Sequence, residues 1–103
     1  VMPQSIYQIY NSKFRFFKFV NSLEFKIFDE NFNEIENSEH YDWLLKHIAD
    51  YGFILRYPED KVDVTGYQYE SWHLRYVGKD IAKEIVKQGL TLDEYIARKD
   101  VQK

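Results

Sequence analysis

The 103-residue sequence contains no cysteine, which excludes a disulfide framework and a metal site built from thiolates. It has no apolar run long enough to span a membrane, and no signal peptide with a basic start, an apolar centre and a small-residue cleavage site. Internal repeats and low-complexity tracts are also absent. Because the formal net charge is −3, the chain has no general attraction to nucleic acid or anionic membranes.

Apolar residues are plentiful, at 45% of the chain with 18% aromatic, so the sequence can form a packed core. Its length allows one domain with a core of modest size. Alternation at period 2 predicts one or two half-buried strands near the N-terminus. The alternating residues are Phe17 and Phe19, then Leu23, Phe25 and Ile27. The basic and aromatic stretch 13–19 also suits a small nucleic-acid binder, which the negative net charge disfavours.

From residue 38 the pattern becomes regular. A helix is predicted over 38–52, with Ser38 as its N-cap and Gly52 just beyond its last turn. Apolar residues at helical spacing give this helix one buried face. They are Tyr41, Leu44, Leu45 and Ile48. The next segment, 53–57, is predicted as a strand that ends at Pro58.

The remaining elements follow in short order. Residues 59–67 are predicted as a charged loop, 72–77 as a strand and 79–89 as a helix closed by Gly89. The inward residues of that helix are predicted to be Ile81, Ile85 and Val86. A Thr-Leu-Asp-Glu capping box at 91–94 starts a final short helix. Together these elements predict an α+β domain with a small, mainly antiparallel sheet packed with helices.

The stretch Tyr-Glu-Ser-Trp-His-Leu-Arg-Tyr-Val-Gly, residues 69–78, is unusually rich in functional groups. Strand alternation places Trp72, Leu74 and Tyr76 on one face, which looks like core, and His73 and Arg75 on the other. Glu70 can approach His73 only if the chain bends near Ser71. With that bend, a carboxylate and an imidazole flank one small space, as in metallohydrolases, where a neutral His binds the metal and a Glu takes a proton from its water. A structural His beside a surface Glu is the other interpretation.

Three parts of the sequence resemble the C-terminal half of a VanY-like D-alanyl-D-alanine carboxypeptidase. They are 51–78, Ala-Lys-Glu-Ile at 82–85 and Gly-Leu-Thr-Leu-Asp-Glu-Tyr-Ile at 89–96. The resemblance runs from about residue 27 to residue 98 and implies the fold and zinc chemistry of that family. It implies His73 as a zinc ligand and Glu70 as the catalytic base, which activates the zinc-bound water and then protonates the leaving amine. Trp72 and Arg75 would shape and support the site.

The resemblance departs from the family in two places. Ser71 stands where the family usually has proline, which leaves the bend at Glu70 less restricted. The upstream family motif Ser-x-His-x-x-Gly-x-Ala-x-Asp, whose His and Asp are the other two zinc ligands, is not found. Alignment puts other residues at its five fixed positions: Phe17, Phe19, Ser22, Glu24 and Lys26, in that order.

Other side chains in the sequence are possible metal ligands. His40 and His47 share a face of the predicted helix, but they lie two turns apart, about 10 Å along its axis, too far to hold one ion together. Each is more simply a surface or helix-end histidine. Asp29 or Glu30 could turn toward His73, although no pattern in the sequence requires it.

Three origins of the altered motif stay open: a natural degenerate paralogue, a deletion variant, and a disturbed reading frame. A deletion is suggested by a faint likeness of residues 5–11 to a segment near the start of the family domain. Gln4 stands where that segment has arginine. We treat 1–103 as a single D-Ala-D-Ala carboxypeptidase-like domain, truncated or altered before residue 27.

The resemblance implies a zinc D,D-carboxypeptidase that hydrolyses the terminal D-Ala–D-Ala bond of peptidoglycan stem peptides in the bacterial cell envelope. The alternative is a catalytically inactive paralogue or fragment that binds peptidoglycan peptides or a protein partner. The expected partner is the stem peptide, and neither nucleic acid nor a membrane span is expected. Since one family ligand is found, this chain could also lack zinc.

Overall fold

The computed structural model describes residues 13–101. The segment 4–11, whose likeness to an early family segment suggested a deletion, lies outside the described residues. Four strands, four helices and three short 3-10 turns are found in the described part. They are β1 (Phe14–Lys18), β2 (Glu24–Asp29), η1 (Ile35–Asn37), α2 (Tyr41–His47), η2 (Ile48–Tyr51), β3 (Phe53–Leu55), η3 (Glu59–Lys61), α3 (Val62–Thr65), β4 (His73–Tyr76), α4 (Lys79–Gln88) and α5 (Leu92–Val101). Among these residues no helix is both long and apolar enough to cross a membrane.

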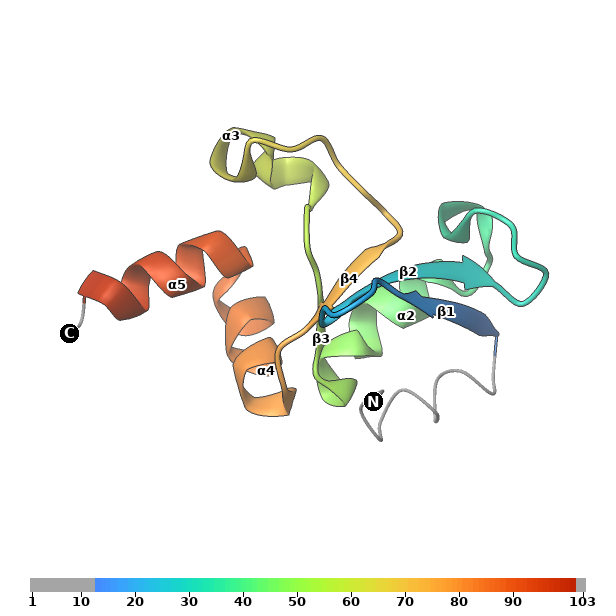
Figure 1. Cartoon of the computed structure of the whole chain (residues 1–103), viewed down its shortest axis with the longest axis horizontal. Coiled ribbons are helices and arrows are strands. Elements are labelled where there is room, and N and C mark those ends of the chain that lie inside the picture. The colour runs from blue at the N-terminus through green and yellow to red at the C-terminus, as the bar shows by residue number, and fades with distance from the viewer. Residues whose placement is uncertain (1–12, 102–103) are drawn as a thin grey trace.

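The four strands form one sheet in the order β1-β2-β4-β3, and every neighbouring pair is antiparallel. The first two strands form a hairpin, whereas β4 enters between β2 and β3 from much later in the chain (Figure 1). This arrangement confirms the predicted α+β fold with a small antiparallel sheet. It also makes β2 and β4 the two central strands, on which the rest of the molecule is built.

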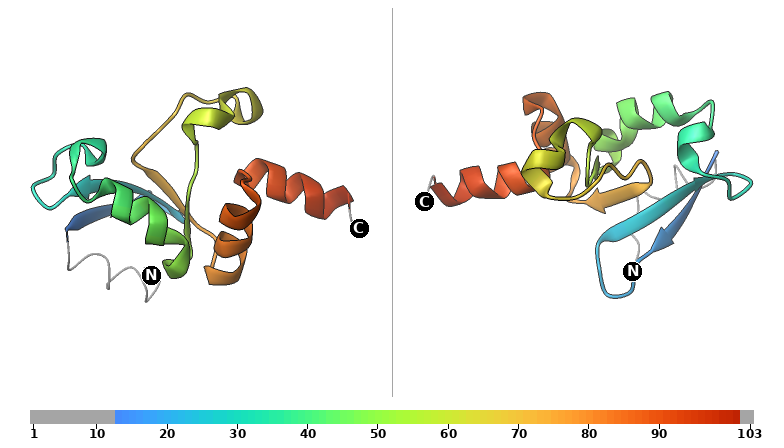
Figure 2. Two further views of the ribbon diagram at one scale, coloured as in Figure 1. Left: turned by 180° about the vertical axis from the view of Figure 1, so that it is seen from behind. Right: turned by 90° about the horizontal axis from the view of Figure 1, so that it is seen from above.

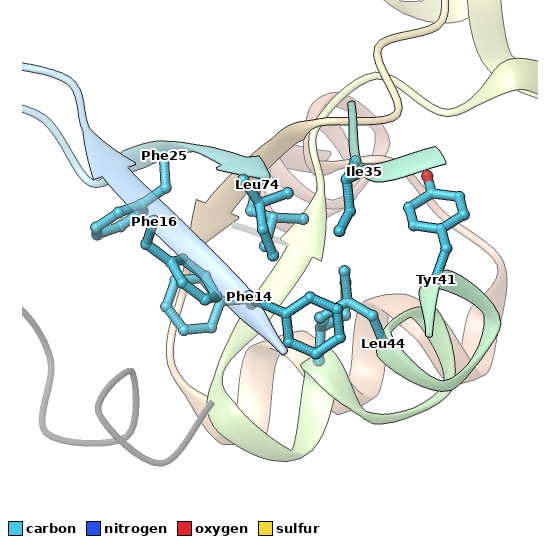
Figure 3. Packing of buried hydrophobic residues seen from close by; sticks show 10 residues of the cluster. Phe14, Phe16, Phe25, Ile35, Tyr41, Leu44 and Leu74 are labelled. Atoms are coloured by element: carbon cyan, nitrogen blue, oxygen red, sulfur yellow. The ribbon is translucent and has the colours of Figure 1, made fainter. Parts of the chain in front are cut away.

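One face of the sheet packs on α2 and forms the main core (Figure 3). Phe25 and Ile27 of β2 and Leu74 of β4 point into it and are fully buried. Leu44 of α2 closes it from the other side. Aromatic rings fill the space, since Phe16 and Phe53 both contact Phe25. Edge-to-face contacts between such rings stabilise a core beyond the area they bury.

A second, smaller core lies at the β3 edge, on the opposite face of the sheet. Ile54 points there because it alternates with Phe53 and Leu55, and it meets Ala82 and Ile85 of α4 and Leu92 of α5. Figure 2 shows α4 beside β3, while α5 extends away from the sheet toward the C-terminus. The two helices cover only the β3 side of this face.

The predicted strands exist, but the sequence assigned the wrong residues to the core of β1. Phe14 and Phe16 are buried, whereas Phe17 is 50% exposed and Phe19 lies just beyond the strand. Leu23 is also exposed, because it belongs to the turn before β2. Four phenylalanines among six residues give both faces of β1 an apolar character, so alternation alone could not choose between them.

The helices needed three corrections. The first helix starts at Tyr41 instead of after Ser38, whose hydroxyl accepts the His40 N–H in a preceding turn. Residues 59–67 are not a simple loop but contain η3 and α3. In α4 the inward pair is Ala82 and Ile85; Ile81 and Val86 are exposed.

Two local signals were correct. Gly52 ends η2 with φ 92°, and a Cβ there would lie 2.7 Å from the ring of Tyr76, so both conformation and space require glycine. The capping box is also present: the Glu94 N–H donates to the Thr91 hydroxyl (3.1 Å), and the Thr91 N–H donates to the Glu94 carboxylate (2.9 Å).

The adjacent residues Phe16 and Phe17 test the orientation of β1. Phe16→Ala is expected to lower the free energy of unfolding by about 3–5 kcal/mol, because it opens a cavity in the core. Phe17→Ala is expected to cost at most about 1.5 kcal/mol, the value of the exposed aromatic pairs it makes with Phe28 and Phe32. Urea unfolding of both variants measures the difference, and equal losses would contradict the strand orientation.

Candidate active site

The candidate site lies on the part of the second sheet face that α4 and α5 leave uncovered. Cross-strand pairing sets Lys26 of β2 opposite His73 of β4, and Glu24 opposite Arg75. Since side chains two apart on a strand share a face, these four residues project from the same side. Arg56, just after β3, reaches this side from the other flank of β4: its N–H donates to the His73 carbonyl (2.9 Å).

The bend that the sequence required at Ser71 is present. The His73 N–H donates to the Glu70 carbonyl (3.4 Å), which closes a turn over 70–73, and the Glu70 N–H donates to the Tyr57 carbonyl (3.1 Å). As predicted, Glu70 and His73 therefore lie together, with the Glu70 Oε1 and the His73 Nδ1 2.8 Å apart.

His73 is held between two carboxylates. Its second ring nitrogen, Nε2, lies 2.9 Å from the Glu24 Oε1, although the two residues are 49 positions apart. The His73 side chain is only 10% exposed. A buried polar group that makes hydrogen bonds at both nitrogens has a defined orientation, which a site needs and a surface histidine lacks.

Glu24 is itself fixed by the β1–β2 turn. Its N–H donates to the Ser22 hydroxyl (3.2 Å), and its carbonyl accepts the Phe19 N–H (2.9 Å). On the side-chain end, the Arg56 Nε lies 3.8 Å from the Glu24 Oε1. Arg56 in turn donates to both carboxylate oxygens of Asp93, at 2.7 and 3.4 Å. Burial alone would lower the pKa of Arg56, but Asp93 holds that pKa above its usual value.

Aromatic rings enclose His73. The indole of Trp72 stacks on it with a centroid distance of 5.2 Å, and the rings of Phe19 and Tyr57 meet it edge-on. Trp72 precedes β4 and is half-buried: it packs against the main core, as the alternation predicts, and it also stacks on the imidazole. The alternation is confirmed for Leu74, which is fully buried, and for the partly exposed Arg75. Lys26 places its Nζ 4.8 Å from the Trp72 ring centre.

A polar pocket of about 470 Å³ adjoins Glu24. It is lined by Lys18, Asn21, Ser22, Leu23, Glu24 and Arg75. Arg75 and Leu23 also border an apolar groove of about 330 Å³ that runs toward α4 and α5. A ligand with a charged end and small apolar groups could contact both spaces and reach Glu24.

Tyr41 is a site residue that the sequence assigned only to the core. Its hydroxyl donates to the Ser71 carbonyl (3.0 Å) and lies 3.0 Å from the Tyr69 hydroxyl. These bonds hold both neighbours of Glu70. The helical spacing correctly indicated that Tyr41 is buried, but only the packing of α2 against the 69–71 segment reveals this second role.

The other proposed ligands lie elsewhere. His40 directly precedes α2 and His47 is its last residue, and α2 covers the opposite face of the sheet. Their imidazoles lie near the carboxylates of Glu39 and Asp50, respectively. Asp29 accepts the N–H groups of residues 31 and 33 in the turn after β2, and these bonds lower its pKa. No contact between Glu30 and His73 is found among the described residues.

Comparison with known proteins identifies the family to which this chain belongs. The family described as "VanY: D-alanyl-D-alanine carboxypeptidase" matches residues 18–79, more than half of the chain. The match begins nine residues before the point at which the sequence resemblance was read, and so it includes β2. The chain belongs to this family of carboxypeptidases.

Two curated relatives and two solved structures are similar to parts of this chain. A bifunctional D-Ala-D-Ala dipeptidase and carboxypeptidase, VanXYC of Enterococcus gallinarum, is 52% identical over 54 residues, which is 52% of this chain and 28% of that protein. A D-alanyl-D-alanine carboxypeptidase of Enterococcus faecalis (strain ATCC 700802 / V583) is 49% identical over 59 residues, 57% of this chain and 22% of the relative. The chain thus spans less than a third of the length of these relatives.

The solved structures share the fold. VanYB in complex with D-alanine-D-alanine has a TM-score of 0.64 and 40% identity, covering 73% of this chain and 41% of that one. A mutant of the VanY D,D-pentapeptidase from a VanB-type resistance cassette, in complex with Zn(II), has a TM-score of 0.63 and 41% identity, covering 72% and 41%. A zinc ion is therefore the metal to test against this site.

The described residues do not fit a catalytic zinc ion. Such an ion needs three protein ligands and an open position. Within 13–101, no three His, Cys, Asp or Glu side chains are placed to hold a metal. Both nitrogens of His73 already contact carboxylates, and its cross-strand neighbour Lys26 carries a positive charge that repels a cation.

Removal of the Tyr41 hydroxyl is expected to destabilise the fold. In Tyr41→Phe the buried Ser71 carbonyl loses its donor, which costs about 1–3 kcal/mol in the free energy of unfolding. Tyr67→Phe is the matched control, since Tyr67 is 57% exposed and should change the stability by less than about 0.5 kcal/mol. Chemical denaturation compares the two, and an unchanged Tyr41→Phe protein would show that this contact is unimportant.

The same hydroxyl predicts a pH dependence. Burial, and then the hydrogen bond with Tyr69, raises the pKa of Tyr41 above its ordinary value of 10.0. Above about pH 10 the unfolded chain therefore loses a proton that the folded protein retains, and stability falls as the pH rises. The stability advantage of the wild-type protein over Tyr41→Phe should shrink between about pH 8 and about pH 11. A constant difference across this range would contradict the prediction.

Proposed function

We propose that this chain forms the stem-peptide-binding part of a VanY-type D-Ala-D-Ala carboxypeptidase. The substrate class is the D-Ala–D-Ala end of a peptidoglycan stem peptide, and the reaction of the whole protein is hydrolysis of that terminal bond. The observation that carries the proposal is the contact between Glu70 and His73, 2.8 Å apart, within the segment that matches the family.

The residues take distinct roles in this proposal. Glu70 is the general base, because its carboxylate can accept a proton from an attacking water and pass it to the leaving amine. His73 is the residue that the family uses as a metal ligand. Trp72 shields the imidazole from water, and Arg75 at the border of the polar pocket is placed to attract the terminal carboxylate of a peptide.

The cofactor and the location follow from the same relatives. We extend the proposal to zinc for the whole protein, since a VanY relative is a complex with Zn(II). In this proposal His73 is the one family ligand that the chain supplies. Action on stem peptides implies the bacterial cell envelope. We also propose that 1–103 belongs to one carboxypeptidase-like domain whose upstream zinc motif is altered before residue 27.

Peptide binding tests the substrate class. A stem pentapeptide that ends in D-Ala–D-Ala is expected to shift the NMR signals of Trp72 and His73, because it enters the space beside Glu70. The matched ligand ends in L-Ala–L-Ala and should shift them at least tenfold more weakly at equal concentration. Equal shifts with both peptides, or none with either, would exclude the proposed substrate class.

Zinc titration and an activity assay test whether the residues of this chain can bind a catalytic zinc ion. Loss of two of three ligands removes most of a coordination free energy that is about 10 kcal/mol or more for complete structural zinc sites. We therefore expect weak zinc binding by calorimetry and little or no release of D-Ala from the pentapeptide. Micromolar or tighter binding, with D-Ala release abolished in Glu70→Ala and retained in the exposed control Glu34→Ala, would show that other residues act as ligands.

A further inference from the structure

Three phenylalanine rings form a cluster on the β1–β2 half of the sheet face that carries the candidate site. The ring centre of Phe17 lies 5.6 Å from that of Phe28 and 5.9 Å from that of Phe32, and the last two are 6.4 Å apart. Phe17 is 50% exposed and Phe32 is 56% exposed. We call these three residues the aromatic platform. A contiguous exposed apolar surface of this kind commonly marks a binding site.

The backbone at Phe32 supports a binding role for the platform. Its φ is 62°, in the left-handed region that bulky side chains rarely adopt. The turn after β2 holds this conformation: the Asp29 carboxylate accepts the N–H groups of Asn31 and Asn33, and the Phe32 N–H donates to the Asp29 carbonyl (3.0 Å). Glycine or asparagine would occupy the position with less strain. Backbone strain of this kind is concentrated at functional sites, where a side chain must be held in one place.

The platform is continuous with the candidate site through Lys26. The Lys26 Nζ lies 4.9 Å from the ring centre of Phe28 and 4.8 Å from that of Trp72, which stacks on His73. Alternate residues of β2 project from the same face. Glu24 borders the polar pocket, Lys26 stands opposite His73, and Phe28 belongs to the platform. Along β2 the order is therefore polar pocket, imidazole and platform.

This order gives the stem peptide a direction, and the inference rests on the proposed function for that ligand. With the terminal carboxylate in the polar pocket beside Arg75, the scissile bond lies near His73 and the peptide continues toward Phe28. A stem pentapeptide has four residues before its terminal bond, and its N-terminus is attached to a sugar. Four extended residues span at most about 14 Å. Phe28 lies two residues, about 7 Å, beyond Lys26 along β2, and Phe32 is beside it. The sugar can therefore reach the platform.

We propose that the aromatic platform binds the N-acetylated amino sugar that carries the stem peptide. The C–H face of a sugar ring packs on aromatic rings, which buries apolar surface while the hydroxyl groups stay in water. The Lys26 ammonium at the border of the platform is a donor for a hydroxyl or acetyl oxygen. Single-stranded nucleic acid also stacks on aromatic rings. Its phosphates would meet the Asp29 carboxylate beside Phe32 and a chain with net charge −3, whereas the amide-linked sugar is neutral.

Calorimetry with two ligands tests the proposal: the D-Ala–D-Ala pentapeptide, and the same peptide joined to its N-acetylated disaccharide. The wild-type protein is expected to bind the second ligand about fivefold more tightly, because the sugar adds a stacking contact. Phe17→Ala and Phe32→Ala should each bring the affinity ratio of the two ligands close to one and leave the pentapeptide affinity unchanged. Trp43→Ala is the matched control, since it removes an exposed aromatic ring from α2 on the other face, and it should keep the wild-type ratio.

The free disaccharide, titrated alone, should shift the NMR signals of Phe17 and Phe32 in the wild-type protein. Equal wild-type affinities for the two ligands, or an unchanged ratio in both folded phenylalanine variants, overturns the inference. An oligothymidylate that shifts the same signals at lower concentration than the disaccharide overturns it as well.

The two proposals fail separately. A pentapeptide that binds with its D-Ala preference, but gains nothing from the disaccharide, leaves the proposed function intact and overturns the sugar site. If neither peptide ligand binds, the proposed function fails, and the disaccharide titration decides this inference: shifts at Phe17 and Phe32 support the platform, and their absence overturns it.

Discussion

The pairing of β2 with β4 is the constraint on which the core and the candidate site both depend. It joins a strand near the start of the described chain to one almost fifty residues later, and its register sets Phe25 beside Leu74 and Lys26 beside His73. The first pair lies in the core and the second on the site face. A shift of one residue would exchange the two faces, so the hydrophobic core fixes the geometry of the site.

Each central strand places core residues on one face of the sheet and site residues on the other. The packed core therefore fixes the backbone from which the site residues project. Phe25 and Ile27 anchor β2 in the core, and Glu24 and Lys26 project from the same backbone on the other side. The loop before β4 is held by two hydrogen bonds: the Tyr41 hydroxyl donates to the Ser71 carbonyl, and the Glu70 N–H donates to the Tyr57 carbonyl. Glu70 is therefore placed by contacts from α2 and from the segment after β3, in addition to the turn over 70–73.

The sequence predicted correctly those contacts that form between residues a few positions apart. The Glu70–His73 contact spans three residues, and the Thr91–Glu94 capping box spans the same distance. The contact of Glu24 with His73 spans 49 residues and depends on strand order, which no local pattern contains. Similarly, the phenylalanines of β1 left its buried face undetermined until the pairing with β2 was known. Family resemblance supplied the roles of individual residues, but it aligned Glu24 with an alanine and so gave it no role.

The residues that the family resemblance aligns with the upstream zinc motif set the electrostatics of this sheet face. By the family alignment, an aspartate and a histidine are replaced by Lys26 and Phe19, and both replacements lie against the aromatic wall around His73. A lysine can occupy this position because its ammonium lies over the rings of Phe28 and Trp72, which stabilise a cation without a carboxylate. Glu24 then remains available for His73 instead of pairing with Lys26. With the ammonium of Lys26 over these rings, Glu24 is the carboxylate partner of the His73 Nε2, and the buried histidine keeps its hydrogen bonds.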